Sequence, residues 1–354
     1  AMSDLNLPLI VITAAHGLPD GANKAFGRYF RMVRYEEAVK WPEEERKAVV
    51  GVVNFGHFHI DGKFCKKFTS LKVVSNIGVG VDHIDVKDLK EKGIYVGHTP
   101  GVLSTTVAEM AFTLMLAAAR NLIQADRYCH SDRDVPSSRP TNMFMGQDLY
   151  GKAVGIVGMG AIGKEIGVRC KAFGMKIFYH NRKPCTKQEE TTAGSAKYCE
   201  NLSELLKISD FVFLVVPLTK STRNLISTNE FKAMKTTAHL INVARGGVVD
   251  TKALVNALKT KEIASAALDV TEPEPLPLSH ELKELPNAIL VPHIGSATRE
   301  CRLRMTYMAL DNLRLGLSSN SLIRTPGEIP TESEVEKINA RYQERLEAED
   351  HKLT

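Results

Sequence analysis

The glycine-rich run GMGAIG, residues 158–163, constrains the fold of this chain more than any other feature. It has the spacing G-x-G-x-x-G, ends the apolar run 153–158 and opens a helical stretch. In a strand–turn–helix unit, the first glycine allows the tight turn, the second admits a pyrophosphate, and the third lets helix and strand pack closely. A turn of purely structural glycines is the alternative. The context nevertheless predicts a dinucleotide site formed by Gly158, Gly160, Ala161, Ile162 and Gly163.

Short apolar runs that alternate with helical stretches divide the chain into two series. The first series lies at 7–13, 48–54 and 71–76, and the second at 153–158, 175–179, 210–217, 238–244, 262–270 and 288–292. Strands that alternate with helices form parallel sheets covered on both faces. We therefore expect an α/β fold with two Rossmann-like, doubly wound parallel-sheet domains, of which the larger binds the dinucleotide.

The stretch 105–128 separates the two series and is apolar on nearly every face. A helix of that kind has to be covered all round, by its own domain or by a second subunit. We expect it to lie in the hinge region and to form the contact of a homodimer. Residues 1–104 and 299–330 would then form a discontinuous substrate domain, and residues 105–298 the dinucleotide-binding domain. The highly charged stretch 331–354 is expected to be a C-terminal tail, either a solvated helix or partly disordered.

The second strand of the dinucleotide unit lacks the acidic residue that NAD-binding versions carry about 20 residues beyond the glycines. His180 lies near that position, and no carboxylate occurs between Glu165 and Glu189. The residues found there instead are Asn181, Arg182 and Lys183. A guanidinium binds phosphate bidentately and an ammonium adds a point charge, whereas an Asp would repel a 2′-phosphate. These could be ordinary surface residues, but the change of charge predicts NADP(H) rather than NAD(H) as the cofactor.

Polar side chains follow three further strands of the second series. They are Arg245 after 238–244, Asp269 at the end of 262–270 with Glu272 and Glu274 just beyond it, and His293 with Ser296 after 288–292. In an open parallel sheet, the carboxyl ends of the strands border the ligand crevice. Each residue alone has a plain explanation: a surface ion pair for Arg245, a solvated loop for Glu274, and a structural role for His293. Their shared place at the strand ends of one nucleotide-binding sheet indicates a catalytic site.

Seven motifs follow one another in an order that identifies a family. They are NIGVGVDHID, TTVAEMAFTLMLAAAR, GIVGMGAIG, VVPLTKSTRNLI, INVARGG, LDVTEPEPLP and VPHIGSAT. With these motifs the chain resembles the D-isomer-specific 2-hydroxyacid dehydrogenases from about residue 7 to 327, nearly its whole length. Within the family it is most similar to glyoxylate/hydroxypyruvate reductases, whose cofactor loop also lacks the acid and carries Arg. The related 2-ketogluconate reductases are a close second.

The resemblance implies an oxidoreductase that reduces a small 2-oxo acid, glyoxylate or hydroxypyruvate, to the D-2-hydroxy acid with NADPH. Arg245 would hold the substrate carboxylate and the reacting carbonyl oxygen, because a planar guanidinium can bind both. His293 would be the general acid that protonates this oxygen as hydride reaches the carbonyl carbon. Glu274 would pair with His293 and stabilise its imidazolium form.

The resemblance also assigns residues to the cofactor and the substrate. Further cofactor contacts would come from Pro217, Thr222, Val243, Ala244, Asp269 and Gly295, with Asp269 at the nicotinamide end. Thr222 could equally be a helix cap. The backbone N–H groups of Val79 and Gly80 would bind the substrate carboxylate, with Ser296 as a further substrate contact.

Two loops bear on substrate choice. Phe55, Gly56 and His57, in the segment NFGHFHID, are candidates for selectivity, although loop packing explains them equally well. Family members that act on small acids usually carry a Trp in the loop after the long helix, and here the loop 130–148 has none. The size of the substrate therefore stays open.

Composition narrows the possible partners. The net charge of +5 is spread over interspersed basic and acidic residues without a basic stripe, so no nucleic-acid partner is expected. The most apolar stretch, 107–119, contains Glu109 and is too short for a membrane span. The six cysteines show no CxxC pair, which argues against a bound metal and favours a reducing, cytoplasmic location.

A nucleotide-sensing, corepressor-like binding protein is the alternative from another class, because such proteins resemble the family and keep the Arg, Glu and His. Two features count against it: the basic loop HNRK at 180–183, and the lack of a long low-complexity tail. Slow turnover of every small 2-oxo acid, together with tight dinucleotide binding, would favour it.

Overall fold

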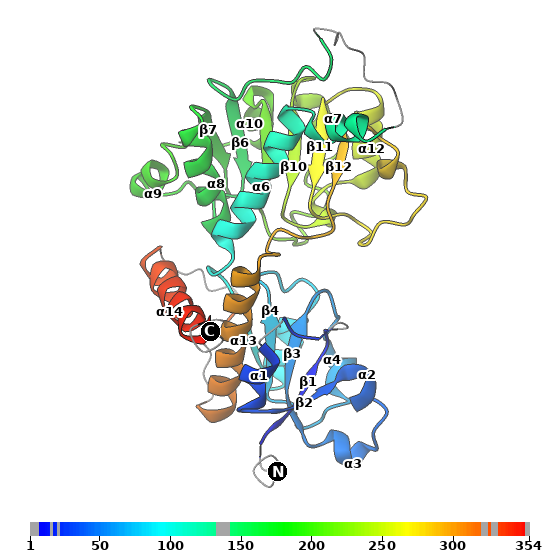
Figure 1. The fold of residues 1–354 in the computed structure, drawn as a ribbon, viewed down its shortest axis with the longest axis vertical. Helices are drawn as coiled ribbons and strands as arrows, with labels where there is room; N and C mark the ends of the chain where they lie inside the picture. Colours follow the sequence, from blue (N-terminus) through cyan, green and yellow to red (C-terminus); the bar gives the residue numbers. More distant parts are fainter. Residues whose placement is uncertain are drawn as a thin grey trace. The chain divides into compact units, whose positions relative to one another are not determined.

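The computed structural model describes residues 7–14, 17–19, 22–131, 142–319, 325–326 and 332–350. The chain folds into two compact units (Figure 1). Unit 1 contains Ala1–Leu103 and Ala297–Thr354, and unit 2 contains Ser104–Ser296. Each unit is built on its own parallel sheet flanked by helices. The predicted fold class, two Rossmann-like α/β domains, is confirmed.

Unit 1 has a five-stranded parallel sheet with the strand order β2-β1-β3-β4-β5. Its strands are β1 (Leu9–Ile12), β2 (Arg31–Arg34), β3 (Val49–Phe55), β4 (Val73–Ile77) and β5 (Tyr95–Gly97). Its helices are α1 (Ala22–Gly27), α2 (Tyr35–Ala38), α3 (Glu43–Arg46), α4 (Gly62–Cys65), α5 (Val86–Glu91), α13 (Arg299–Ser318) and α14 (Glu332–Asp350). This strand order is that of flavodoxin-like folds, in which ligands bind beyond the carboxyl ends of the strands.

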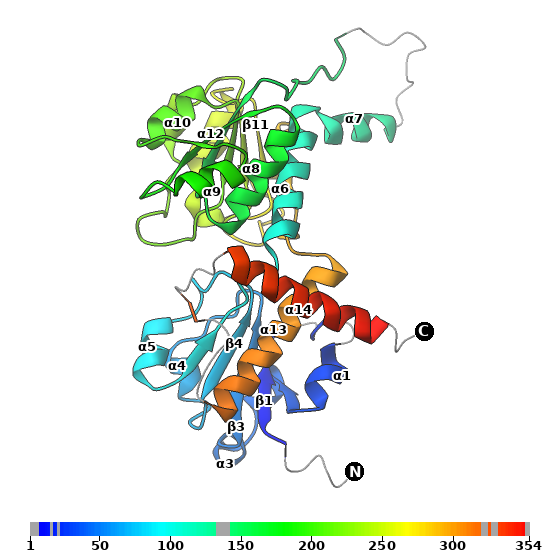
Figure 2. The same ribbon diagram turned by 90° about the vertical axis from the view of Figure 1, so that its left-hand side faces the viewer.

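Both faces of this sheet are covered, so its central strands are mostly buried. β1 and β4 carry buried side chains along their whole length, as expected for a parallel sheet. Helix α13 covers one face (Figures 1 and 2), where Ser75 of β4 donates a hydrogen bond of 2.9 Å to the Ala309 carbonyl. Side chains alternate along a strand, and Val74 accordingly packs with Phe64 and Phe68 in the core on the other face.

Helix α14 packs on α13 within unit 1, around a buried carboxylate. Asp311 of α13 accepts hydrogen bonds from Arg341 (3.2 Å) and from the Tyr342 hydroxyl (3.1 Å). Tyr342 and Leu346 are themselves buried. The charged composition of 331–354 predicts a solvated or partly disordered tail. The described part, 332–350, is a mostly exposed helix, and the buried side chains Tyr342 and Leu346 with the buried carboxylate of Asp311 anchor it. Residue 331 and residues 351–354 lie outside the described residues.

Unit 2 has a seven-stranded parallel sheet with the order β12-β11-β10-β9-β6-β7-β8. Its strands are β6 (Ala153–Val157), β7 (Lys176–His180), β8 (Lys197–Tyr198), β9 (Phe211–Leu214), β10 (His239–Asn242), β11 (Ser265–Leu268) and β12 (Ala288–Leu290). Its helices are α6 (Ser104–Ala119), α7 (Leu122–Cys129), α8 (Ala161–Ala172), α9 (Lys187–Thr192), α10 (Leu202–Ile208), α11 (Thr228–Ala233), η2 (Gly246–Val248), α12 (Thr251–Lys259) and η3 (Glu281–Lys283). The strand order reverses between β6 and β9, which is where such sheets bind dinucleotides.

Two helices, α6 and α7, replace the single helix predicted for 105–128, so that prediction was wrong. Asn121 between them has a φ of 50°, in the left-handed region, and its side chain donates a hydrogen bond of 3.0 Å to the Met145 carbonyl. The Ala119 carbonyl accepts a hydrogen bond of 2.8 Å from the Gln147 N–H. These contacts end α6, because the carbonyl at its last residue bonds another segment instead of the next helical turn.

The apolar composition of α6 is explained mainly by its own unit. Most of its side chains are buried, and it contacts α8, β10 and β11. Exposed apolar side chains lie nearby, at Leu122 of α7 (57% exposed) and Phe173 after α8 (46% exposed). Among the described residues no single helix is long and apolar enough to cross a membrane, and α6 and α7 meet those criteria only together, across a bend of 67°.

Candidate active site

The glycine run forms a tight turn from β6 into α8. Gly158 has a φ of 104°, in the left-handed region, and a side chain there would lie 2.8 Å from the Val215 carbonyl oxygen. A side chain at Gly163 would collide with the Gly158 carbonyl, so this glycine lets the helix pack on the strand. At Gly160 a side chain would meet nothing within 4 Å, and no side chain caps α8. The turn leaves open space before a helix N-terminus, which fits a pyrophosphate.

The loop after β7 carries the basic residues of the expected cofactor site. Arg182 and Lys183 are exposed in it. Asn181 Oδ1 accepts a hydrogen bond of 2.7 Å from the Met159 N–H. A neutral amide, rather than a carboxylate, therefore joins this loop to the glycine run.

Tyr179, the buried residue before this loop, sets its shape. Its hydroxyl accepts a hydrogen bond from the Cys185 N–H (2.8 Å) and donates one to Glu190 (2.9 Å). Burial raises the pKa of the Tyr179 hydroxyl, so it remains a donor. Hydrogen bonds from Lys187 and Tyr179 lower the pKa of Glu190, which keeps that residue an acceptor. Hydrogen bonds within the protein thus hold the loop at both ends, at Asn181 and at Cys185.

Arg245 follows a turn that the buried Asn242 holds at the end of β10. Asn242 Nδ2 donates to the Arg245 carbonyl (3.0 Å), and its Oδ1 accepts from the Ala244 N–H (3.0 Å). Half-buried Arg245 donates from Nη1 to the Ala244 carbonyl (2.9 Å). A side chain at Gly246 would collide with the Thr271 backbone, so this glycine lets the loop after β11 pack on the Arg245 turn.

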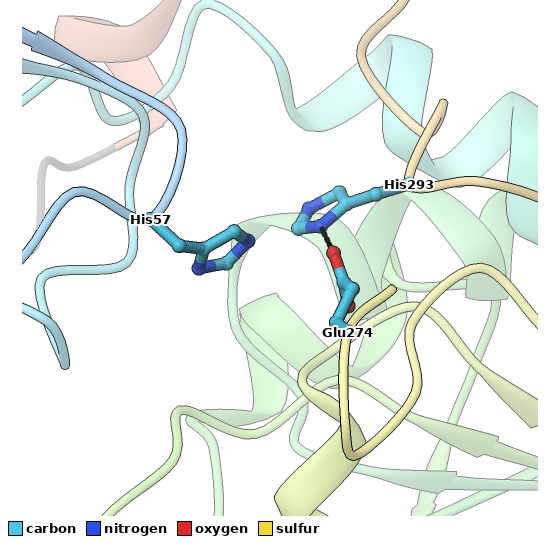
Figure 3. A group of neighbouring side chains, drawn as sticks. All are labelled: His57, Glu274 and His293. Carbon is cyan, nitrogen blue, oxygen red and sulfur yellow. Dashed lines mark hydrogen bonds and ion pairs between the residues drawn. The ribbon is translucent and has the colours of Figure 1, made fainter. Parts of the chain in front are cut away.

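Glu274, in that loop, and His293, in the loop after β12, form a hydrogen-bonded pair (Figure 3). His293 Nδ1 and Glu274 Oε1 are 2.6 Å apart. Because a carboxylate only accepts, Nδ1 is the donor, and Nε2 is the nitrogen on the other side of the ring. The second oxygen of Glu274 accepts from the Thr271 N–H (3.2 Å). The pair has the arrangement of an acid–base residue and the group that orients it.

Buried Asp269 holds the loop that carries His293. Its Oδ1 accepts from the Ile294 N–H (2.7 Å) and its Oδ2 from the Gly295 N–H (2.8 Å), and its carbonyl accepts from the His293 N–H (2.9 Å). Burial raises the pKa of Asp269, while these N–H groups favour its ionised form. His293 has a φ of 54°, which is uncommon for a residue with a side chain. The loop thus holds a strained residue, a feature that clusters at functional sites.

In unit 1, the loop after β4 carries Val79 and Gly80. Val79 is 37% exposed. Across the part of the chain that the structure describes, neither N–H group donates a hydrogen bond to the protein. Two adjacent unbonded N–H groups are the property that a carboxylate contact requires.

The loop after β3 in unit 1 carries Phe55, Gly56 and His57. The Arg302 guanidinium lies over the Phe55 ring, 4.9 Å from its centre, which gives Phe55 a packing role. Gly56 has a φ of 88°, and exposed His57 lies edge-on to His83, with ring centres 5.7 Å apart. In the loop without Trp, residues 132–141 lie outside the described residues.

The other predicted cofactor residues also lie at strand ends of unit 2. The Thr222 hydroxyl donates to the Pro217 carbonyl (2.6 Å) and accepts from the Thr219 N–H (2.8 Å), so Thr222 closes the turn after β9. Val243 and Ala244 are buried in the turn before Arg245. Ser296, the last residue of unit 2, follows Gly295.

Sequence reasoning missed three side chains that shape these loops: Asn76, Tyr179 and Asn242. Each is buried at or next to the end of a parallel strand and bonds the backbone of a site loop. The available signal was a polar atom inside an otherwise apolar strand, as in VVSN or LIN. Buried polar groups are nearly always hydrogen-bonded, so such residues point to a loop that needs support.

Unit 2 therefore combines, at one sheet edge, a phosphate turn, a guanidinium and an imidazole–carboxylate pair. The family model described as D-isomer specific 2-hydroxyacid dehydrogenase, NAD binding domain, matches residues 112–295, which include all of these groups. The glyoxylate reductase of Thermococcus gammatolerans is 42% identical over 319 residues, 86% of this chain and 92% of that protein.

Two crystal structures are similar over most of the chain. A glyoxylate reductase from Paecilomyes thermophila has a TM-score of 0.78 at 30% identity, covering 91% of this chain and 99% of that one. The NADPH-dependent glyoxylate/hydroxypyruvate reductase of Sinorhizobium meliloti, in complex with NADP and malonate, has a TM-score of 0.79 at 32% identity, covering 91% of this chain and 98% of that one. The chain therefore belongs to the D-isomer-specific 2-hydroxyacid dehydrogenase family, as its motifs predict, and is an oxidoreductase that acts on 2-oxo and 2-hydroxy acids.

Proposed function

We propose that the protein reduces glyoxylate to glycolate, or hydroxypyruvate to D-glycerate, with NADPH. The observation that carries the proposal is the 2.6 Å hydrogen bond between His293 and Glu274, at the edge of the sheet that bears the glycine run. Reduction of a carbonyl to a hydroxyl needs a hydride and a proton. NADPH, when bound, supplies the hydride. A side chain of the protein has to supply the proton.

Charge in the loop after β7 supports NADPH over NADH. Arg182 and Lys183 offer a guanidinium and an ammonium for the 2′-phosphate, and Asn181 offers an amide donor. The nearest carboxylate after these residues in the chain is Glu189, which already bonds Lys164 (2.8 Å). The glycine run would hold the pyrophosphate. NADP in the Sinorhizobium meliloti relative agrees with this choice.

His293 would donate the proton from Nε2 to the carbonyl oxygen. Because Nδ1 donates to Glu274, the carboxylate orients the ring and stabilises its positive charge before transfer. Asp269 fixes the backbone on the far side of His293 through Ile294 and Gly295. After transfer the neutral imidazole would take a proton from solvent.

Arg245 would bind the substrate carboxylate and polarise the carbonyl oxygen, because its planar fork can serve two oxygen acceptors. The N–H groups of Val79 and Gly80 would bind the same carboxylate. Ser296, Phe55 and Gly56 would contact the rest of the substrate. A 2-oxo acid offers both acceptors, because its carboxylate is bonded directly to the carbonyl carbon.

A homodimer is part of the proposal. The exposed side chains of Leu122, within the region 104–129, and of Phe173 form apolar surface. A second copy of the chain would cover this surface. Light scattering at micromolar concentration should give the mass of a dimer. A monomer mass would refute this part and leave the chemistry untouched.

Initial rates with glyoxylate, hydroxypyruvate and 2-ketogluconate, each with NADPH, test the substrate. We expect one of the first two to have the highest kcat/KM, and hydroxypyruvate to yield D-glycerate. If 2-ketogluconate is best, the protein is a sugar-acid reductase with the same chemistry. If nothing is turned over while the dinucleotide binds tightly, a corepressor-like binding protein replaces the enzyme.

A further inference from the structure

We propose that Asn76 and His98 are positioning residues that aim the backbone N–H groups of Val79 and Gly80 at the substrate carboxylate. The inference rests on the proposed function and deepens it, because it names the device that builds the anion site in unit 1. Neither side chain is assigned a contact with the substrate. Both act through the backbone of the loop after β4.

Asn76 of β4 is 2% exposed and uses its whole amide inside the protein. Its Nδ2 donates to the carbonyls of Gly78 (3.3 Å) and Gly80 (3.0 Å). Its Oδ1 accepts from Asn54 Nδ2 (3.0 Å), and Asn54 in turn accepts from the Thr13 hydroxyl (2.6 Å). This chain of buried hydrogen bonds fixes which way the Asn76 amide faces, because a flipped amide would place donor against donor.

His98, directly after β5, bonds the Val79 carbonyl, which lies in the chain between the two carbonyls that Asn76 bonds. Its Nδ1 lies 3.1 Å from the Val79 carbonyl oxygen, and since a carbonyl only accepts, Nδ1 carries the proton. His98 is buried, and its own carbonyl accepts from Asn312 Nδ2 of α13 (3.1 Å). The Gly78 N–H donates to the Thr99 hydroxyl (2.9 Å). Three successive carbonyls, of Gly78, Val79 and Gly80, are thus bonded by buried side chains.

Peptide planarity converts these carbonyl contacts into oriented donors. In a trans peptide, the C=O of one residue and the N–H of the next point in opposite directions. With the Gly78 carbonyl turned to Asn76, the Val79 N–H must point the other way. With the Val79 carbonyl turned to His98, the Gly80 N–H does the same. Donors held in place beforehand bind an anion without the cost of ordering the loop.

The proposal predicts a selective loss of carboxylate affinity. Asn76→Ala removes the side-chain contacts to the Gly78 and Gly80 carbonyls, of which Gly78 keeps a hydrogen bond from the Thr99 N–H (3.0 Å). His98→Leu removes the side-chain contact to the Val79 carbonyl. We expect KM for glyoxylate to rise about tenfold or more in each variant, with a smaller change in kcat and an unchanged Kd for NADPH. Oxalate, a carboxylate that cannot be reduced by this chemistry, should lose affinity in parallel in calorimetric titrations of the cofactor-loaded protein.

Ser75→Ala is the matched control, because Ser75 is a buried polar residue of the same strand that bonds the Ala309 carbonyl and not the loop. Its KM and its oxalate Kd should equal those of the wild type. His98→Asn should recover much of the affinity that His98→Leu loses, because the Asn amide nitrogen lies where Nδ1 of His lies. If Asn76 and His98 had only a structural role, the variants would have a lower melting temperature without the selective loss of oxalate affinity and without its recovery in His98→Asn.

Wild-type oxalate affinity in both Asn76→Ala and His98→Leu would overturn the proposal, as would a wild-type protein that binds no oxalate. If the wild type binds oxalate but reduces neither glyoxylate nor hydroxypyruvate, the proposed function fails. A loss of oxalate binding in the variants would then still support the positioning role. The two failures are therefore distinguishable.

Discussion

His293 Nδ1 donates a hydrogen bond to Glu274 Oε1 across 2.6 Å, and this contact joins the loops after β12 and β11. The backbone next to His293 is held as well, because Asp269 accepts hydrogen bonds from the N–H groups of Ile294 and Gly295. Charge-assisted hydrogen bonds are roughly twice as strong as neutral ones. The ring therefore has one orientation, with Nε2 as the nitrogen that can reach a substrate.

Glu274→Gln should lower kcat by about a hundredfold or more while the dinucleotide Kd stays the same. The Gln oxygen can still accept from Nδ1, but the charge that stabilises the imidazolium is gone. Glu272→Gln is the control: Glu272 lies in the same loop and pairs with Arg223 at 2.8 Å. Steady-state kinetics should show at most a few-fold loss there. Equal losses in both variants would contradict a specific role for Glu274.

Asp269→Asn should lower both the melting temperature and kcat. One of the two N–H groups that donate to Asp269 would then face an amide NH2 and lose its acceptor. A buried unsatisfied donor lowers the free energy of unfolding by about 1–3 kcal/mol, and the His293 loop would become less rigid. Asp250→Asn serves as the comparison, because Asp250 caps α12 and Asn caps a helix equally well. Thermal unfolding and kcat should be near wild type for Asp250→Asn, and no difference between the two variants would remove the anchoring role of Asp269.

Arg182→Ala should weaken NADPH binding about tenfold or more and NADH binding much less, because only NADPH has the 2′-phosphate that the guanidinium would bind. Lys176→Ala removes an exposed positive charge at the opposite end of β7 and should change neither Kd. Fluorescence titration gives the Kd of NADPH and the Kd of NADH for each of the two variants. Equal weakening of NADPH and NADH in Arg182→Ala would show that the loop does not select the cofactor.

The buried His239 predicts a loss of stability in acid. Burial lowers the pKa of His239 to about 4. In the folded protein its ring stacks on the Phe211 ring, with ring centres 5.0 Å apart, and Nδ1 lies 2.6 Å from the Ser265 hydroxyl oxygen. In the unfolded chain the pKa is about 6.5. Between these values the unfolded chain binds the extra proton, so the free energy of unfolding falls as pH drops through this window, by at most about 3 kcal/mol.

Chemical unfolding at pH 7 and pH 5 checks this prediction. The wild type should lose more stability between the two values than His239→Gln does. His130→Gln removes a His whose side chain is 81% exposed and should keep the wild-type pH dependence. If His239→Gln and the wild type lose the same amount, another group is responsible for the acid sensitivity.

The central strands and the edge strand β12 could be predicted from the sequence, but the other three edge strands could not. β1, β3 and β4 lie within or beside apolar runs because both faces of a parallel sheet are buried. β2 (RMVR), β5 (YVG) and β8 (KY) lie at sheet edges and are short or polar, so no apolar run marks them. The bend after α6 was also missed, because it depends on a left-handed Asn121 and on Gln147, which lies far along the chain.

The chemically active residues were easier to predict than the residues that support them. Arg245, Glu274 and His293 follow strands, and parallel topology brings the carboxyl ends of neighbouring strands to one edge. The roles of Asp269 and Asn76 depend on which backbone N–H and carbonyl groups face them, and those directions follow from loop dihedral angles rather than from residue type. Apolar residues in a charged stretch, such as Tyr342, were likewise masked by its composition.

The most direct test of the central claim is the ratio of kcat/KM for NADPH to that for NADH, measured by initial rates of glyoxylate reduction with the wild-type protein. A phosphate bound by Arg182 and Lys183, in a loop without a carboxylate, predicts a ratio of about one hundred or more in favour of NADPH. A ratio near one, or a preference for NADH, would contradict the assignment of that loop and of the cofactor.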